Sequence, residues 1–250
     1  RSNGTIMLRS SHIRRCLRAV GKPLDKITRQ DVTGWMSTQE WGRAARASAR
    51  ASLRTFWAWA VATGATASNP MADIPPVRQL PGVPKPIPDA VVVVALSQAP
   101  PEIALAIEVM AVCGLRRAEC ACLRACDIEP VGQGWMLRVV GKGGRVRMVP
   151  CPPLLARKLK ARGGWVFPGA QQGHISPGWL GKLISRYLPP GWTPHALRHR
   201  YASVAYAKGH DIRAVQHLLG HASVATTQMY IALNDMAVQE AASGAWHLAS

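Results

Sequence analysis

The sequence predicts a mainly α-helical protein with one small antiparallel β-hairpin, an α+β fold divided into two domains. Most of the chain carries apolar residues at helical spacing, between cap and proline signals that start helices. Residues 135–140 and 145–149 alternate like strands around a glycine-rich turn at 141–144. A proline-rich stretch at 74–88 interrupts this pattern and divides the chain into two parts.

The proline-rich stretch has the composition of a linker. It reads IPPVRQLPGVPKPIP and holds six prolines in fifteen residues. Because proline has no amide donor, such a segment neither continues a helix nor enters the interior of a sheet. We expect it to be extended and semi-rigid. The sequence therefore predicts a small N-terminal domain at 1–73, a linker at 74–88 and a larger C-terminal domain at 89–250.

The N-terminal domain is predicted to be helical. Apolar residues at helical spacing occupy 6–20, and a Thr-x-x-Asp pair at 28–31 is typical of the capping box that opens a helix. A third helix is expected at about 42–62. Its arginines form one stripe without a matching carboxylate, which suits a phosphate backbone better than an ordinary solvated face. We interpret these arginines as DNA-binding residues: Arg43, Arg46, Arg50 and Arg54.

The C-terminal domain is predicted to hold helices on both sides of the hairpin. Gly209 and Gly220 are expected to end two of them. The expected helices lie at 89–98, 101–112 and 116–124, after Pro152-Pro153, Ser176-Pro177 and Thr193-Pro194, and at 236–245.

The chain is strongly basic. It has 31 Lys+Arg against 13 Asp+Glu, a formal net charge of +18 and a pI near 10.7. Both halves share the excess, so it is not a charged tail on a neutral body. Such a charge favours a polyanionic partner such as nucleic acid, although a ribosomal or membrane-surface protein would also be basic. No apolar run approaches the roughly 20 residues that a membrane span needs.

Six cysteines are predicted to be buried, reduced thiols. Their spacing lacks the paired C-x-x-C arrangement of a structural zinc site. They are Cys16, Cys113, Cys120, Cys122, Cys126 and Cys151.

Four short motifs follow one another along the C-terminal domain. They are GLRRAE at 114–119, GKG at 141–143, HALRH at 195–199 and LLGH at 218–221, with a tyrosine nine residues after the last histidine. Each motif alone has an ordinary explanation, such as a surface ion pair, a solvated turn lysine, a helix cap or a half-buried tyrosine. Together they supply the candidate catalytic residues: Arg116, Lys142, His195, Arg198, His221 and Tyr230.

These residue types suit phosphodiester cleavage without a metal. Guanidiniums bind phosphate by paired hydrogen bonds, and a clamp of arginines and histidines would stabilise the extra charge on pentacoordinate phosphorus. A tyrosine hydroxyl can attack phosphorus, and a lysine can protonate the leaving 5′ oxygen. No clustered carboxylates of the kind that hold Mg²⁺ occur near these motifs. We therefore expect neither a metal nor another cofactor.

The motifs, in this order and at these separations, resemble those of the tyrosine recombinases, also called the phage integrase family. The resemblance covers essentially the whole chain, because the arginine-rich helices that end in SNP look like the family's core-DNA-binding domain. It implies a two-domain DNA clamp with a catalytic domain at 89–250. Lys142 resembles the hairpin lysine that acts as general acid, and Arg145 beside it is a further DNA-binding candidate. Glu119 and Asp127 match structural acids of the family and are left out of the predicted site.

The remaining positions carry over one by one. Arg116 and Arg198 match the phosphate-binding pair of arginines. His195 matches the histidine that assists proton transfer, and His221 matches the histidine or tryptophan that contacts the phosphate. Tyr230 matches the nucleophile.

The resemblance implies a site-specific DNA recombinase, with a phage integrase favoured. Such an enzyme cleaves and rejoins strands through a 3′-phosphotyrosine, needs no ATP, and exchanges strands through a Holliday junction. The implied partners are double-stranded DNA at core sites, a homo-tetramer on that DNA and accessory DNA-bending proteins, with no membrane. The implied location is the bacterial cytoplasm, at the nucleoid. Because the sequence starts at Arg1 rather than Met, a preceding arm-binding segment stays an open alternative.

Other roles stay open at this point. Within the family, a Xer-like resolvase of chromosome dimers and a transposon or integron enzyme compete with an integrase. A type IB topoisomerase uses similar chemistry without pairing two sites. Residues 211–230 could also be interpreted as the helix-turn-helix of a non-catalytic regulator.

Overall fold

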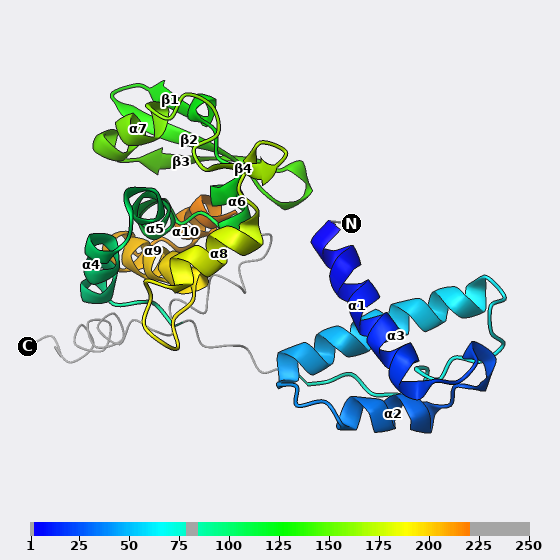
Figure 1. Cartoon of the computed structure of the whole chain (residues 1–250). Helices are drawn as coiled ribbons and strands as arrows, with labels where there is room; N and C mark the ends of the chain where they lie inside the picture. Colours follow the sequence, from blue (N-terminus) through cyan, green and yellow to red (C-terminus); the bar gives the residue numbers. More distant parts are fainter. Residues whose placement is uncertain (1–2, 79–84, 221–250) are drawn as a thin grey trace, which may run out of the picture. The chain divides into compact units, whose positions relative to one another are not determined.

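The computed structural model describes residues 3–78 and 85–220, in two compact units (Figure 1). The N-terminal unit is Arg1–Gly82 and the C-terminal unit is Val83–Ser250, so the boundary falls within the predicted linker. Ile74 is buried in the core of the first unit and Ile87 in the core of the second. These two residues therefore belong to the cores rather than to the linker. The helix predicted at 236–245 lies outside the described residues.

The N-terminal unit is helical, as predicted. Trp57 and Leu53 of its longest helix are buried against Trp35 and Met71. The capping box is also confirmed, because the Thr28 amide donates to Asp31 Oδ2 at 2.9 Å and the Asp31 amide donates back to the Thr28 hydroxyl. The helices are α1 (Asn3–Val20), η1 (Leu24–Lys26), α2 (Arg29–Ser37) and α3 (Arg43–Ala62).

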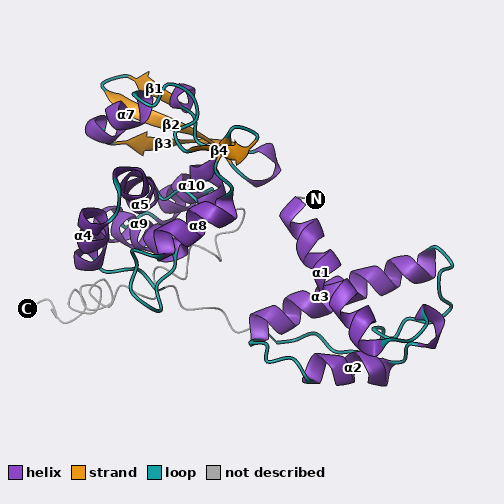
Figure 2. Cartoon of the chain, viewed as in Figure 1, coloured by secondary structure: helices purple, strands orange, loops and turns teal. Residues whose placement is uncertain are grey.

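The C-terminal unit combines helices with a small sheet, which confirms the predicted fold class (Figure 2). The helix predicted at 116–124 is shorter than expected. The elements before the hairpin are α4 (Asp89–Gln98), α5 (Pro101–Cys113), α6 (Arg117–Ala121) and η2 (Ala125–Asp127). The strands and the turn helix are β1 (Ile128–Val131), β2 (Gly134–Val140), η3 (Lys142–Gly144), β3 (Val146–Cys151) and β4 (Pro168–Gln171). The later helices are α7 (Pro153–Lys160), α8 (Pro177–Ser185), α9 (Pro194–Gly209) and α10 (Ile212–Leu219).

The sheet has the order β1-β2-β3, and both neighbouring pairs are antiparallel. The pair β2–β3 is the predicted hairpin. Gly143 and Gly144 of its turn both have φ 77, a backbone conformation that favours glycine. Helix α7 packs on β1 and β2, whereas α5 and α10 pack on β3. The hairpin is therefore packed directly against α5 and α10 through β3.

Helix α5 is the centre of the C-terminal core. Its residues from Leu105 to Ala111 are almost all apolar and buried, as expected for a helix that is covered on every side. It contacts α4, α6, α8, α9 and β3. Gly114 ends it in the left-handed conformation, at φ 64. The GLRRAE motif thus begins at the end of the buried central helix of this unit.

The cysteines are all free thiols. Cys16, Cys113, Cys120 and Cys151 are buried as predicted, but Cys122 and Cys126 are exposed, so the prediction is wrong for these two. Within residues 3–78 and 85–220, no group of three or more His, Cys, Asp or Glu side chains is placed to hold a metal ion. In the same ranges no helix is long and apolar enough to cross a membrane.

Candidate active site

Arg198 joins two of the predicted motifs. It lies in the first turns of α9, which packs on α5 and α10. Its Nη1 donates to the carbonyl of Gly114 at 2.6 Å, and its Nη2 donates to the carbonyl of Leu219 at 2.6 Å. The residue is only 1% exposed. The end of α5 and the end of α10 are thus held together by one buried guanidinium.

Glu119, which was not among the predicted site residues, is the centre of the arginine cluster. Its carboxylate accepts both Nη atoms of Arg147, at 2.9 and 2.7 Å. It also accepts Arg116 Nη1 at 2.8 Å and the Arg116 amide at 2.7 Å. Arg198 Nη1 lies 3.8 Å away. Burial would raise the pKa of Glu119, but the hydrogen bonds and charges of Arg147 and Arg116 outweigh it and hold that pKa at about 2.

Arg147 is the second residue that sequence reasoning missed. It occupies the same face of β3 as the buried Val149 and Cys151, and the residue is 8% exposed. Alternation in a strand sends every second side chain to the same face, so a charged residue in phase with buried ones requires a buried partner. The alternation along β3 could therefore have indicated that Arg147 is buried and paired, and the structure shows that its partner is Glu119.

Arg116 presents the most accessible guanidinium of this cluster. Its side chain is 35% exposed, against 7% for Arg147 and 1% for Arg198. Its Nη2 donates to the carbonyl of Gly220 at 3.3 Å. The three guanidiniums around a single ionised carboxylate carry a net positive charge, so the cluster can attract an anion such as phosphate.

His195 is an exposed residue in the first turn of α9. Its ring centroid lies 4.3 Å from that of His199, at an interplanar angle of 67°. Desolvation lowers the pKa of His195, and the positive charges of Arg198 and Arg116 lower it further. The imidazole is therefore neutral at neutral pH and can accept a proton.

His199 predicts a pH dependence of stability. Desolvation and the neighbouring His195 and Arg198 lower its pKa from 6.5 to about 4. The unfolded chain therefore takes up this proton first, so stability is full above about pH 6.5 and falls as the pH drops towards 4. The loss of stability that comes from protonating Glu119 occurs at lower pH, below the ordinary pKa of a glutamate side chain. Urea unfolding between pH 7 and pH 4 should show a smaller loss for His199→Gln than for the unchanged protein, and equal losses would contradict the assignment.

The structure brings together part of the predicted site. His195 lies close enough to Arg116 and Arg198 for the charges of these two arginines to lower its pKa. Lys142 lies in the turn η3, and its side chain is outside the described part of the chain. His221 and Tyr230 also lie outside the described residues. Gly220 directly precedes this segment, and its carbonyl is within the cluster.

The N-terminal arginine stripe needs one correction. Arg50 is 8% exposed, and its guanidinium donates to the carbonyl of Ile74, so it closes the core of its own unit and does not lie on the exposed stripe. Arg43, Arg46 and Arg54 are exposed. A hollow of about 640 Å³ is lined by Trp41, Arg43, Arg46, Val77 and Arg78. Arg145 is exposed beside the hairpin turn.

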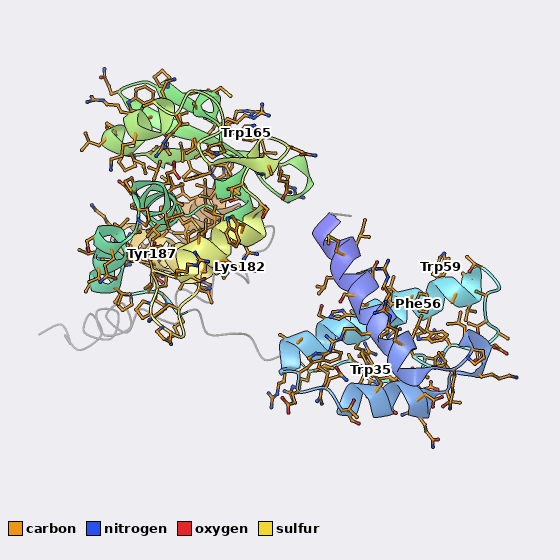
Figure 3. The ribbon with its side chains drawn as sticks, in the orientation of Figure 1. Trp35, Phe56, Trp59, Trp165, Lys182 and Tyr187 are labelled. Carbon is orange, nitrogen blue, oxygen red and sulfur yellow. The ribbon has the colours of Figure 1, made fainter. Side chains whose placement is uncertain are left out.

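A second basic hollow lies beside the motif residues of the C-terminal unit. It measures about 600 Å³ and runs between the start of α6, one side of α8 and the start of α9. Arg117, Lys182 and Arg186 supply its charge, and Figure 3 shows Lys182 on α8. Arg117 follows Arg116 in the chain, and Pro194 of the same hollow precedes His195. The hollow and the arginine cluster are thus both built on the starts of α6 and α9.

Comparison with known proteins identifies the family. The model of the phage integrase family matches residues 90–236. A tyrosine recombinase XerC from Shewanella amazonensis is 30% identical over 237 residues, covering 84% of this chain and 78% of the relative. A tyrosine recombinase XerC from Nitrobacter winogradskyi is 37% identical over 141 residues, covering 48% of this chain and 42% of the relative. The chain thus spans less than half the length of some relatives. It belongs to the phage integrase family, and the predicted family is confirmed.

Solved structures show the same fold. A lambda integrase dimer bound to a COC′ core site matches with a TM-score of 0.74 and 21% identity, covering 92% of this chain and 72% of the other. XerH recombinase bound to a palindromic difH substrate matches with a TM-score of 0.69 and 19% identity, covering 88% and 73%. Both likenesses confirm the mainly helical fold with its small antiparallel sheet.

Proposed function

We propose that this chain is a site-specific DNA recombinase that cleaves and rejoins DNA through a phosphotyrosine. The observation that carries the proposal is the cluster of Arg116, Arg147 and Arg198 around the ionised Glu119. It forms a net positive site with one accessible guanidinium, and a neutral His195 stands beside it. Such a site suits a phosphodiester that gains negative charge during reaction.

The proposed reaction conserves the phosphodiester energy. The Tyr230 hydroxyl attacks phosphorus, a bond forms between its oxygen and phosphorus, and the bond to the 5′ oxygen breaks. Lys142 gives a proton to that leaving oxygen, and His195 assists the transfer of the tyrosine proton. Arg116, Arg198 and His221 bind the phosphate and stabilise its added negative charge. Attack of a 5′ hydroxyl on the phosphotyrosine reverses the step without ATP.

The relatives guide the choice of biological role. Those that match over most of the chain are called XerC recombinases, which favours a Xer-type recombinase over the phage integrase expected from the sequence. One solved neighbour is a lambda integrase tetramer bound to a Holliday junction, with a TM-score of 0.71 and 18% identity. We take double-stranded DNA as the partner, a tetramer as the working assembly and the bacterial nucleoid as its location.

The regulator alternative has little support. Helix α10 would be the first helix of the suggested helix-turn-helix, and it packs on α9 and β3. The carbonyls of Leu218 and Leu219 at its end accept hydrogen bonds from Arg147 and Arg198. This end is therefore built into the arginine cluster.

Covalent trapping tests the proposed function. The full chain is incubated, in the presence of EDTA, with a library of nicked DNA duplexes whose central segment has a random sequence. Protein–DNA adducts are then separated under denaturing conditions. The expected result is an adduct whose DNA is enriched in one sequence, and Tyr230→Phe is expected to abolish it because the nucleophilic oxygen is removed.

The other outcomes separate the alternatives. Adducts with unselected sequence would favour a topoisomerase. If an adduct persists in Tyr230→Phe, the nucleophile is a different residue. If sequence-selective binding occurs without any adduct, the protein is a DNA-binding regulator and the proposed reaction is wrong.

A further inference from the structure

We infer that Arg147 is a positioning residue that keeps Arg116 available for phosphate by satisfying Glu119. This inference rests on the proposed function. Arg147 is neither one of the predicted motif residues nor an accessible cation, since its side chain is 7% exposed. Its effect on bound DNA must therefore pass through the groups it contacts.

All three guanidinium nitrogens of Arg147 donate a hydrogen bond. Nη1 donates to Glu119 Oε1 at 2.9 Å, and Nη2 donates to Glu119 Oε2 at 2.7 Å. Nε donates to the carbonyl of Leu218 at 2.9 Å. A lysine offers a point charge and cannot reproduce this planar, paired arrangement. The geometry is specific to arginine.

The contacts connect three parts of the site. Arg147 itself lies on β3, directly after the turn that carries Lys142. Glu119 holds the amide and the guanidinium of Arg116. Gly220 packs against Arg147, since a Cβ at that glycine would lie 3.0 Å from Arg147 Cδ. One side chain thus links the hairpin, the accessible arginine and the end of α10.

The charge balance explains why the link matters. Glu119 accepts hydrogen bonds from both Arg147 and Arg116, and its carboxylate is ionised. Without Arg147, the carboxylate would have Arg116 as its main cation, with Arg198 Nη1 at 3.8 Å. Arg116, whose Nη1 already donates to Glu119 at 2.8 Å, would then be the main partner of that negative charge, so Glu119 would compete more strongly with the phosphate for it. We therefore expect the loss of Arg147 to weaken phosphate binding at a residue that it does not touch.

The first experiment measures adduct formation on the DNA sequence recovered by covalent trapping. Arg147→Lys and Arg147→Met are expected to lower the single-turnover cleavage rate about 100-fold, the size of effect caused by a small misplacement of a reacting group. DNA affinity should stay within about threefold, because other cations hold most of the backbone. The matched control is Arg138→Met, which removes an exposed arginine on β2 that is 3.6 Å from Asp127. It is expected to keep the original rate.

A double variant distinguishes positioning from mere support of the fold. Glu119→Gln removes the negative charge that would capture Arg116. The double variant is therefore expected to cleave about tenfold faster than Arg147→Met alone, because substitutions of residues in contact do not have additive effects. A purely structural role predicts an equal or larger loss in the double variant, and that result would overturn the inference.

The second experiment does not depend on cleavage. Inorganic phosphate is titrated into ¹⁵N-labelled protein while the arginine side-chain NMR signals are followed, with Arg116→Lys and Arg198→Lys for assignment. We expect phosphate to shift the Arg116 signal in the unchanged protein and to do so about tenfold more weakly in Arg147→Met, in line with a lost charge-assisted contact. If the Arg116 signal and its response are the same in a folded Arg147→Met, the inference is wrong whether or not the protein cleaves DNA. If this response changes as expected but no adduct forms with any DNA, the proposed function fails and the positioning role stands.

Discussion

Replacing Arg198 with lysine is expected to lower the rate of covalent DNA cleavage about 1,000-fold and to destabilise the C-terminal unit by about 2 kcal/mol. The guanidinium bridges the carbonyls of Gly114 and Leu219, each at 2.6 Å. Lysine keeps the charge but offers one compact ammonium, which can hold only one of these carbonyls in the same position. The other carbonyl is left buried without its donor, and the ends of α5 and α10 separate.

The measurement has two parts, with a control in the same helix. Single-turnover adduct formation gives the rate, and urea unfolding gives the stability. Arg200→Lys is the matched control, because Arg200 also lies on α9 but pairs with the exposed Asp89 and the carbonyl of Ala111. It is expected to cost less than about 1 kcal/mol, as for other exposed ion pairs, and to leave the cleavage rate unchanged. An Arg198→Lys protein that cleaves as fast as the original would show that the bridge is not needed.

Much of the fold could be predicted because local signals were strong. The third N-terminal helix starts and ends within one residue of its predicted limits, and the hairpin was identified from alternation around a glycine turn. The strand β1 was missed because Ile128–Val131 is four residues long and contains a proline, so it shows no alternation. Strand β4 is equally short and has no buried residue to mark it.

The candidate site was predicted only in part, for a different reason. Sequence motifs predict which side chains form the site, but they do not show which charged residues neutralise one another in the interior. Arg50 has the same spacing and charge as Arg46 and Arg54, yet only Arg50 faces the carbonyl of Ile74. Arg147 and Glu119 lie 28 positions apart, and their pairing depends on how β3 and α6 are each placed against α5. Such partners follow from tertiary structure, so periodicity can indicate that a partner is needed without naming it.

Two motif glycines, Gly114 and Gly220, lie within the arginine cluster. Gly220 has φ 62 and packs against Arg147, and its carbonyl accepts Arg116 Nη2. Gly114 has φ 64, and its carbonyl accepts Arg198 Nη1. In both cases a residue without a Cβ brings a backbone carbonyl close to a guanidinium. The glycines therefore contribute acceptors that orient the arginines of the cluster.

Gly114→Ala is expected to destabilise the C-terminal unit by about 3 kcal/mol or more, which corresponds to a fall in Tm of roughly 6–12 °C for a unit of this size. Two effects add. The left-handed conformation at φ 64 is strained for alanine, and the new Cβ would lie 2.2 Å from Cδ1 of the Tyr201 ring. The Tyr201 ring is half-buried and packs against the buried cluster that contains Ala202, Tyr206 and Leu219, so it has little room to give way. The chain must therefore move at the residue that leads directly into Leu115 and Arg116.

Gly132→Ala separates the two effects in that prediction. Gly132 has a similar φ of 56 in the turn between β1 and β2, and no atom lies within 4 Å of the position of its Cβ. Its substitution should cost only the backbone strain, about 1 kcal/mol. Thermal unfolding of both variants measures the difference, which reports the contact with Tyr201. Adduct formation should fall for Gly114→Ala alone, even at temperatures where it stays folded, because the shifted carbonyl no longer orients Arg198. If the two alanines cost the same and cleave alike, Gly114 serves only as a helix end, and the arginine cluster does not depend on its close packing.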